Sequence, residues 1–266
     1  MKSLVEGVEY VKNTDSFSFD FENDSGKSIV KLVPDGPYQI TDFDPFTYFG
    51  YVFEDNIDHQ VKKDFINAVK YPDGKIKSED LARFIRKSVS SLDRKASLAG
   101  YDVIVRPQSS SRLNDLLLDE IYKVSMADTF LDIEMVKSIP SKIEFNFQAY
   151  ADSLRRKPGV SSGNIKDAME AVSRMLTDVR KLDYVKLGTD VKPKHRMFLK
   201  NFYGFRDGES KRNFEKLQGK KILIVDDVST TMSTLRYVLN ALKIVNDTNE
   251  ITMFCLLGNA IEKPAV

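Results

Sequence analysis

The sequence predicts an α/β protein whose core is a mostly parallel sheet flanked by helices. Two short apolar runs, at residues 101–105 and 222–225, are each followed by a polar loop and then by apolar residues at helical spacing. A further apolar run follows at residues 251–257. Such runs, rich in β-branched residues, are typical of parallel strands buried on both faces. Ligands of such sheets bind at the carboxyl ends of the strands, so we expect the functional site there.

Residues 1–95 are predicted to form a β-rich and helical hood region. Phe17, Phe19 and Phe21 alternate with polar residues at the period of a strand. The dense aromatics of residues 43–53 are interpreted as a packing surface, because clustered aromatics normally supply buried area. A base-stacking surface is the alternative.

Residues 96–266 are predicted to form the α/β domain. Helical spacing predicts one helix from residue 78, with Ser78 as its N-cap, and another inside an insertion at about 138–190. Asn164 is the predicted N-cap of that second helix, because Asp167 follows three residues later.

A basic segment follows the insertion and is predicted to be a flexible arm at about 192–220. Residues 192–221 carry ten Lys or Arg against three acidic residues, in a chain whose net charge is only +1. A mobile, positively charged arm suits a lid that closes over a polyanion and excludes water. A plain solvated loop and a contact to RNA or DNA are the alternatives.

Composition favours a cytoplasmic protein. The N-terminus lacks the apolar core of a signal peptide, and no stretch of the 266 residues has the length and apolarity of a membrane span. Cys255 is the only cysteine and lies in an apolar run, so we expect a buried thiol without an internal disulfide. The two histidines, His59 and His195, lie far apart in sequence, and a structural zinc site is not expected.

The most informative stretch begins at Lys220 and reads KKILIVDDVSTTMSTL. A strand is followed by the acidic pair Asp226 and Asp227, a hydroxyl-rich turn and a helix start. A helix N-terminus favours a phosphate, because it offers unpaired N–H groups and a positive dipole end. Adjacent carboxylates instead suit a neutral diol or a cation that the ligand carries. A sugar phosphate has both features, whereas an ordinary strand with a helix cap is the alternative reading.

This stretch closely resembles the ribose-phosphate motif of type I phosphoribosyltransferases. The resemblance implies that Asp226 and Asp227 are the catalytic pair and hold the ribose hydroxyls of 5-phosphoribosyl 1-pyrophosphate. It also implies that the following loop holds the 5′-phosphate, through Ser229, Thr230, Thr231, Met232, Ser233 and Thr234. The family usually has Gly where this chain has Met232; we expect Met232 to adopt a negative φ beside a working phosphate site.

Two further segments match the family by position. The polar loop after the first core strand corresponds to the pyrophosphate loop, with Ser109, Ser110 and Arg112 as candidate contacts. The basic arm corresponds to the flexible loop that closes over the pyrophosphate, with Lys194, Arg196 and Arg206 as candidates. The order of these segments, across about residues 97–258, looks most like ComF-type members.

The resemblance implies Mg-dependent transfer of a phosphoribosyl group to a nitrogen nucleophile, such as a nucleobase, in nucleotide metabolism. The Mg ion would be carried by the ligand, without a direct protein ligand. The acceptor is not identified, although members that use 6-oxopurines commonly carry an acidic residue where this chain has Thr230. A non-catalytic protein that senses the donor or associates with nucleic acid is the alternative, as is a structural module with a degenerate site. Nucleic acid is not favoured as a partner, no membrane partner is expected, and a homodimer is left open.

Overall fold

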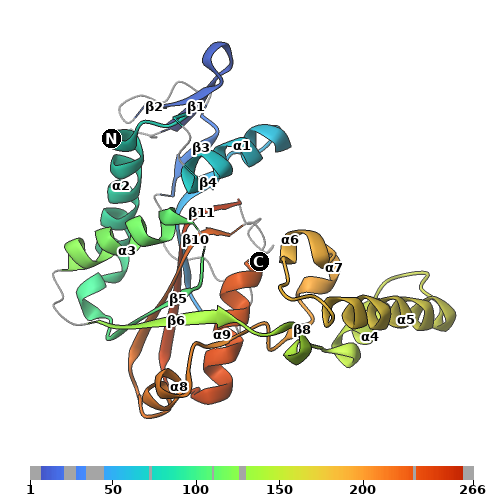
Figure 1. Cartoon of the computed structure of the whole chain (residues 1–266). Helices are drawn as coiled ribbons and strands as arrows, with labels where there is room; N and C mark the ends of the chain where they lie inside the picture. The colour runs from blue at the N-terminus through green and yellow to red at the C-terminus, as the bar shows by residue number, and fades with distance from the viewer. Residues whose placement is uncertain are drawn as a thin grey trace.

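A computed structural model provides the coordinates of the chain (Figure 1). It describes residues 7–20, 28–33, 45–71, 74–109, 111–125, 130–229 and 232–259. Phe21 of the predicted alternating strand lies outside these ranges. Within them, no helix combines the length and the apolarity needed to cross a lipid bilayer.

A mixed sheet organises the described chain, and the predicted fold class is confirmed. The five central strands, β4-β11-β10-β5-β6, pair in parallel, while three strands on one flank and β9 on the other pair antiparallel. The strand order is β2 (Ser16–Asp20), β1 (Gly7–Val11), β3 (Val30–Leu32), β4 (Thr47–Phe53), β11 (Glu250–Asn259), β10 (Lys221–Ser229), β5 (Val103–Pro107), β6 (Leu131–Lys137) and β9 (Tyr203–Phe205).

Helices cover both faces of this sheet (Figure 1). Successive side chains of β10 point to opposite faces, as in any strand. Ile222 and Ile224 therefore join a core formed with α9, whereas Leu223 and Val225 join a second core on the other face. The first core includes α9 (Ser233–Val245), and the second includes α1 (His59–Lys70), α2 (Ser78–Ala96) and α3 (Arg112–Ser125).

The N-terminal β-rich segment belongs to this same sheet. Strands β1 to β3 extend one edge, and β4 pairs in parallel with β11 from Thr47 to Phe53. One sheet therefore contains strands from both sides of residue 95, where the boundary between the hood region and the α/β domain was predicted. Tyr51 and Phe53 are only 1% exposed, so these aromatics of β4 pack into the core, as predicted, whereas Phe46 is 53% exposed and Phe43 lies outside the described residues.

The insertion lies between β6 and β9 and projects from the edge of the sheet (Figure 1). Its short strands β7 and β8 pair antiparallel. Part of the predicted flexible arm is folded here, and the rest forms β9 and α8 (Gly208–Glu215). The helices and strands of the insertion are β7 (Glu144–Phe145), α4 (Phe147–Arg155), α5 (Ser162–Val179), α6 (Leu187–Asp190), α7 (Pro193–Arg196) and β8 (Leu199–Lys200).

Both predicted helix caps are wrong by one to three residues. Ser161, not Asn164, caps α5: it has extended backbone angles, and its hydroxyl accepts a hydrogen bond from the Asn164 backbone N–H at 3.2 Å. This is the usual N-cap geometry, in which the hydroxyl satisfies an unpaired N–H of the first turn. Ser78 is the first residue of α2, after an N-cap at Lys77 without a side-chain cap bond.

Close packing of β4 against α2 gives a stability prediction. A Cβ at Gly50 would lie 1.7 Å from Ser88 Oγ and 2.8 Å from the backbone oxygen of Leu256. Because a backbone oxygen in the sheet cannot move aside, Gly50→Ala is expected to lower the free energy of unfolding by about 1–3 kcal/mol. Gly100→Ala, where no heavy atom lies within 4 Å of the added Cβ, is the matched control and should change it by less than about 0.5 kcal/mol. Equal denaturant midpoints for the two variants would contradict the packing.

Candidate functional site

A polar cavity of about 380 Å³ lies at the carboxyl ends of β10 and β5. It brings together four residues predicted from the sequence: the acidic pair, Thr234 of α9 and Ser109 of the loop after β5. The other lining residues are Lys70, Tyr71, Pro107, Gln108, Lys137, Tyr184, Tyr203 and Val228. The site therefore draws on the N-terminal segment and the insertion as well as on the central sheet.

The acidic pair is buried at the end of β10. Asp226 and Asp227 are 5% and 1% exposed. One oxygen of each carboxyl group accepts a backbone hydrogen bond, Asp226 Oδ1 from Asp227 N at 3.0 Å and Asp227 Oδ1 from Val228 N at 2.6 Å. In the part of the chain that the structure describes, the Oδ2 atom of each is buried without a hydrogen-bond partner. The pair thus keeps two acceptor oxygens that a hydroxyl-bearing ligand can satisfy.

Lys70 is a residue of this site that the sequence analysis did not single out. It ends α1, and its Nζ lies 2.9 Å from Asp227 Oδ1. The Asp227 side chain is 2% exposed and the Lys70 side chain 23% exposed, so this ion pair is largely shielded from water. The only local sign of Lys70 in the sequence is its place as a basic residue in the last turn of a helix, and such residues are common wherever a helix ends.

Burial and the neighbouring charge set the protonation of the pair. Burial, followed by the Asp227 carboxylate, raises the pKa of Asp226 to about 8, while Lys70 acts in the opposite direction. Burial acts to lower the pKa of Lys70, but the attraction and hydrogen bond of Asp227 outweigh it and the net shift is upward. At neutral pH the site without ligand therefore favours a proton on Asp226 beside an ion pair of Lys70 with Asp227.

Tyrosines and a second lysine form the rest of the wall. Lys137, the last residue of β6, donates a hydrogen bond to Tyr184 Oη at 2.6 Å, and its Nζ lies 4.6 Å from the centroid of that ring. Tyr71 and Tyr184 are each about half exposed, at 53% and 54%. Tyr203 is buried, and burial, together with the charge of Asp226, raises its pKa. The cavity thus offers aromatic rings at the solvent side and a cation beside them.

The loop that leads into α9 differs from the prediction at Met232. Thr230 and Thr231 lie outside the described residues, and Met232 has φ +56° and ψ 7°, in the left-handed region. The expected negative φ is therefore wrong. The side chain is only 6% exposed and packs in the core formed with α9. Burial of this flexible thioether offsets the strain of a position that Gly would fill more easily.

The other predicted contacts lie outside the cavity lining. Ser229, Met232 and Ser233 are close in sequence to residues that line the cavity, but they are not part of its lining. Ser110 lies outside the described residues. Arg112 lines a different cavity, between α2 and α3, together with Arg86 and Leu116.

The three candidates from the basic arm also point elsewhere. Lys194 is exposed on α7, and Arg196 donates to the backbone oxygen of Val191 at 2.9 Å. Arg206 forms an ion pair with Glu134 of β6. The described positions of these side chains therefore supply no cation to the acidic pair.

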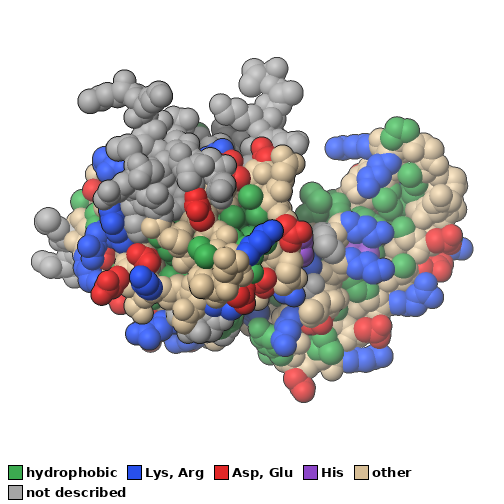
Figure 2. Space-filling model, turned by 90° about the horizontal axis from the view of Figure 1, so that it is seen from above, with side chains coloured by type: hydrophobic (Ala, Val, Ile, Leu, Met, Phe, Trp, Pro, Cys, Tyr) green, Lys and Arg blue, Asp and Glu red, His purple; other side chains and the backbone are tan. Residues whose placement is uncertain are grey.

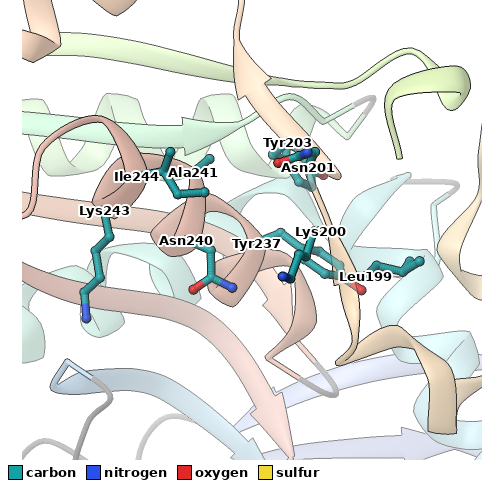
Figure 3. A pocket seen from close by; sticks show the side chains of 9 residues that line it. All are labelled: Leu199, Lys200, Asn201, Tyr203, Tyr237, Asn240, Ala241, Lys243 and Ile244. Carbon is teal, nitrogen blue, oxygen red and sulfur yellow. The ribbon is translucent and has the colours of Figure 1, made fainter. Parts of the chain in front are cut away.

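A second cavity, of about 390 Å³, lies outside α9 (Figure 3). Side chains from α9, including Tyr237 and Asn240, face Leu199, Lys200 and Asn201 across it. Tyr203 lines both cavities, but no acidic side chain lines this one. Its chemistry is mainly apolar with two lysines, and it is not the site of the sequence motif.

The raised pKa of Asp226 predicts how stability depends on pH. The folded protein holds a proton up to about pH 8 that the unfolded chain releases above its ordinary pKa of 3.8, so Asp226 costs increasing stability as pH rises between these values. Asp226→Asn removes this cost. The free energy of unfolding of this variant minus that of the wild type, measured by urea titration, should therefore increase from pH 4 to pH 8.

Asp102→Asn is the control of opposite sign. The backbone N–H of Lys221, then the Lys220 side chain, lowers the pKa of Asp102, so its contribution is present above the ordinary pKa and is lost as pH falls. A difference between Asp226→Asn and the wild type that is constant with pH would contradict the buried, protonated carboxyl group.

The left-handed backbone of Met232 gives a prediction on two variants. Met232→Ala and Met232→Gly both remove a buried side chain, which costs about 2–5 kcal/mol in a protein core. Because Gly adopts positive φ without the Cβ clash, Met232→Gly should be more stable than Met232→Ala by about 1 kcal/mol. Chemical denaturation of both variants measures which of the two is more stable. Greater stability of the Ala variant would show that φ is negative at this position.

Comparison with known proteins identifies the domain that contains the acidic pair. Residues 168–265 match the family model described as phosphoribosyl transferase domain. The matched range includes β10, α9 and β11, whereas Lys70, Ser109 and Lys137 lie before it. No curated protein matches the chain. The recognition based on the strand, acidic pair and helix is confirmed: the C-terminal part of this chain, residues 168–265, is similar to the phosphoribosyl transferase domain family.

Proposed function

We propose that the protein is an Mg-dependent phosphoribosyltransferase that binds 5-phosphoribosyl 1-pyrophosphate and transfers its phosphoribosyl group to a nitrogen nucleophile. The observation that carries this proposal is the buried pair Asp226 and Asp227 at the carboxyl end of β10, directly before the start of α9. The family match over residues 168–265 supports phosphoribosyl transfer in general. The donor, the metal and the class of acceptor belong to the proposal.

In this proposal the ribose lies on the acidic pair and the 5′-phosphate lies at the start of α9. The two buried Oδ2 atoms have acceptor capacity for the ribose hydroxyls. The backbone N–H groups and the positive dipole end of the first turn of α9, with Thr234 in the cavity wall, suit the phosphate. The ribose site and the phosphate site lie close together because β10 runs almost directly into α9.

Pyrophosphate would lie over the end of β5, the strand next to β10. Gln108 and Ser109 line the cavity there, and the Lys137 ammonium lies beside them on β6. The transition state of the transfer carries positive charge on the ribose and negative charge on the leaving group. Fixed donors and cations that match this charge supply most of the catalysis, because the reaction needs no nucleophilic side chain.

The cavity also fits an Mg ion that arrives on the donor. Mg²⁺ prefers oxygen ligands and usually keeps several waters while it binds substrate phosphates. The oxygen-bearing side chains of Gln108, Ser109 and Tyr71 line the volume around the proposed pyrophosphate. When bound, the ion would neutralise part of the charge of the departing pyrophosphate. We propose no side chain as its direct ligand.

One observation favours the alternative, a non-catalytic protein that senses the donor or associates with nucleic acid. Residues 138–202 carry thirteen Lys or Arg against seven acidic residues, although the whole chain is nearly neutral. Lys and Arg side chains gather on the lobe formed by the insertion, at the right of Figure 2. Such an excess of positive charge is also the electrostatic footprint of nucleic-acid binding.

The function is tested by donor binding and by pyrophosphate release. Asp226→Asn and Asp227→Asn are each expected to weaken binding of the Mg complex of the donor by about 1.5–3 kcal/mol, about tenfold or more, because each loses a charge-assisted hydrogen bond. Titration calorimetry at pH 8.5 measures the affinities, and Asp102→Asn, on the surface, serves as the control. Unchanged affinity in both site variants would remove the ribose assignment.

A panel of nitrogen heterocycles separates the enzyme from the sensor. The proposal expects pyrophosphate release that requires the donor, Mg and one class of acceptor, and that both Asp→Asn variants diminish. Donor binding without release for any acceptor would favour the sensor.

A further inference from the structure

Lys70 lines the same cavity as both parts of the proposed donor site. The same cavity is lined by Lys70, by Asp227 on β10 and by Gln108 and Ser109 after β5. Lys70 Nζ contacts Asp227 Oδ1 at 2.9 Å, so it pairs with the same carboxyl group whose other oxygen, Oδ2, the proposed function gives to a ribose hydroxyl. Because Lys70 comes from α1, it lies outside residues 168–265 and the domain match does not include it.

Donor binding would change the charge balance of this cavity. Its lining holds two carboxyl groups and two lysines, so the charges balance when both carboxyl groups are ionised. Ribose hydroxyls can replace the lysine as hydrogen-bond donors to Asp227, but they carry no charge. Pyrophosphate brings several negative charges, only part of which a divalent cation offsets. Once it no longer pairs with Asp227, the Lys70 ammonium would have its most favourable electrostatic interaction with the pyrophosphate.

The position of Lys70 allows such a change of partner. Phe65 and Val69 of α1 are 0% and 1% exposed, so the helix backbone is fixed in the core. The Lys70 side chain keeps 23% of its surface exposed, at the open side of the ion pair. A lysine side chain is a compact charge on a flexible four-carbon stem, which can be redirected without backbone movement.

We propose that Lys70 is a donor-binding residue that exchanges partners: it pairs with Asp227 in the free protein and contacts the pyrophosphate when the donor is bound. This inference rests on the proposed function. It goes beyond it by assigning a pyrophosphate contact to the N-terminal segment, and it gives the free site a built-in cation that the pyrophosphate draws away from Asp227.

Two ligands that differ only in pyrophosphate test the exchange. In Lys70→Met, the Mg complex of 5-phosphoribosyl 1-pyrophosphate should bind at least tenfold more weakly than in the wild type. Ribose 5-phosphate should bind about equally well, because it lacks the pyrophosphate that the ammonium contacts and its hydroxyl reaches Asp227 Oδ2, which Lys70 leaves open. Lys70→Arg keeps the charge and should recover most of the donor affinity. Equal losses for both ligands in Lys70→Met would overturn the exchange and leave Lys70 as a group that only orients Asp227.

The Asp227→Asn background separates a direct contact from an effect through Asp227, and it removes the risk that one buried charge is left unpaired. If Lys70 contacts pyrophosphate, adding Lys70→Met to Asp227→Asn should weaken donor binding by a further factor of five or more. If Lys70 acts only through Asp227, the second substitution should change nothing, and the proposal fails.

Two controls complete the design. Lys63→Met makes the same substitution at an exposed position of the same helix and should leave both affinities unchanged. Thermal unfolding of every variant without ligand reports folding. A wild-type protein that binds neither ligand would refute the proposed function itself, and the exchange with it, whereas wild-type binding with equal losses in Lys70→Met refutes the exchange alone.

Discussion

The site depends on the burial of two adjacent carboxyl groups at the end of one strand. Taking a carboxylate out of water is costly unless it is paired or hydrogen bonded. Here the cost is reduced by a proton on Asp226, by backbone hydrogen bonds and by the ion pair of Asp227 with Lys70. A buried ion pair is weak support for stability, since apolar replacements often do as well. Its presence is better explained by a ligand that uses these oxygens.

The parallel sheet places this pair where a ligand can reach it. Strand β10 lies between β11 and β5, and apolar side chains bury both of its faces. The carboxyl ends of these strands meet at one edge, so the loop after β5 and the first turn of α9 line the same cavity. The ion pair adds a constraint from α1, which ties the N-terminal segment to the phosphoribosyltransferase domain. The antiparallel strands β1 to β3 extend the sheet without lining the cavity, whereas β9 contributes Tyr203 to it.

The sequence predicted the elements whose signals are local. The aliphatic run and the helical spacing around Asp226 and Asp227 determine β10 and α9, and the same pattern predicts β5 with Ser109 at its end. The pairing of Lys70 with Asp227 could not be predicted, because it joins residues far apart in the chain and depends on how α1 packs over the sheet. Membership of β4 in the parallel sheet is a tertiary property of the same kind.

Two errors have local causes. At α5, Ser161 and Asn164 are both good caps, and only the backbone angles distinguish them. At Met232 the preference of the residue for negative φ is overridden by the turn between β10 and α9 and by burial of its side chain.

A crystal structure of the protein with ribose 5-phosphate tests the central claim most directly. The account predicts ribose hydroxyl oxygens within about 2.5–3.0 Å of carboxylate oxygens of Asp226 and Asp227, with the phosphate at the first turn of α9. Ribose 5-phosphate bound in the cavity outside α9, with Lys70 still on Asp227 and the acidic pair untouched, would contradict it.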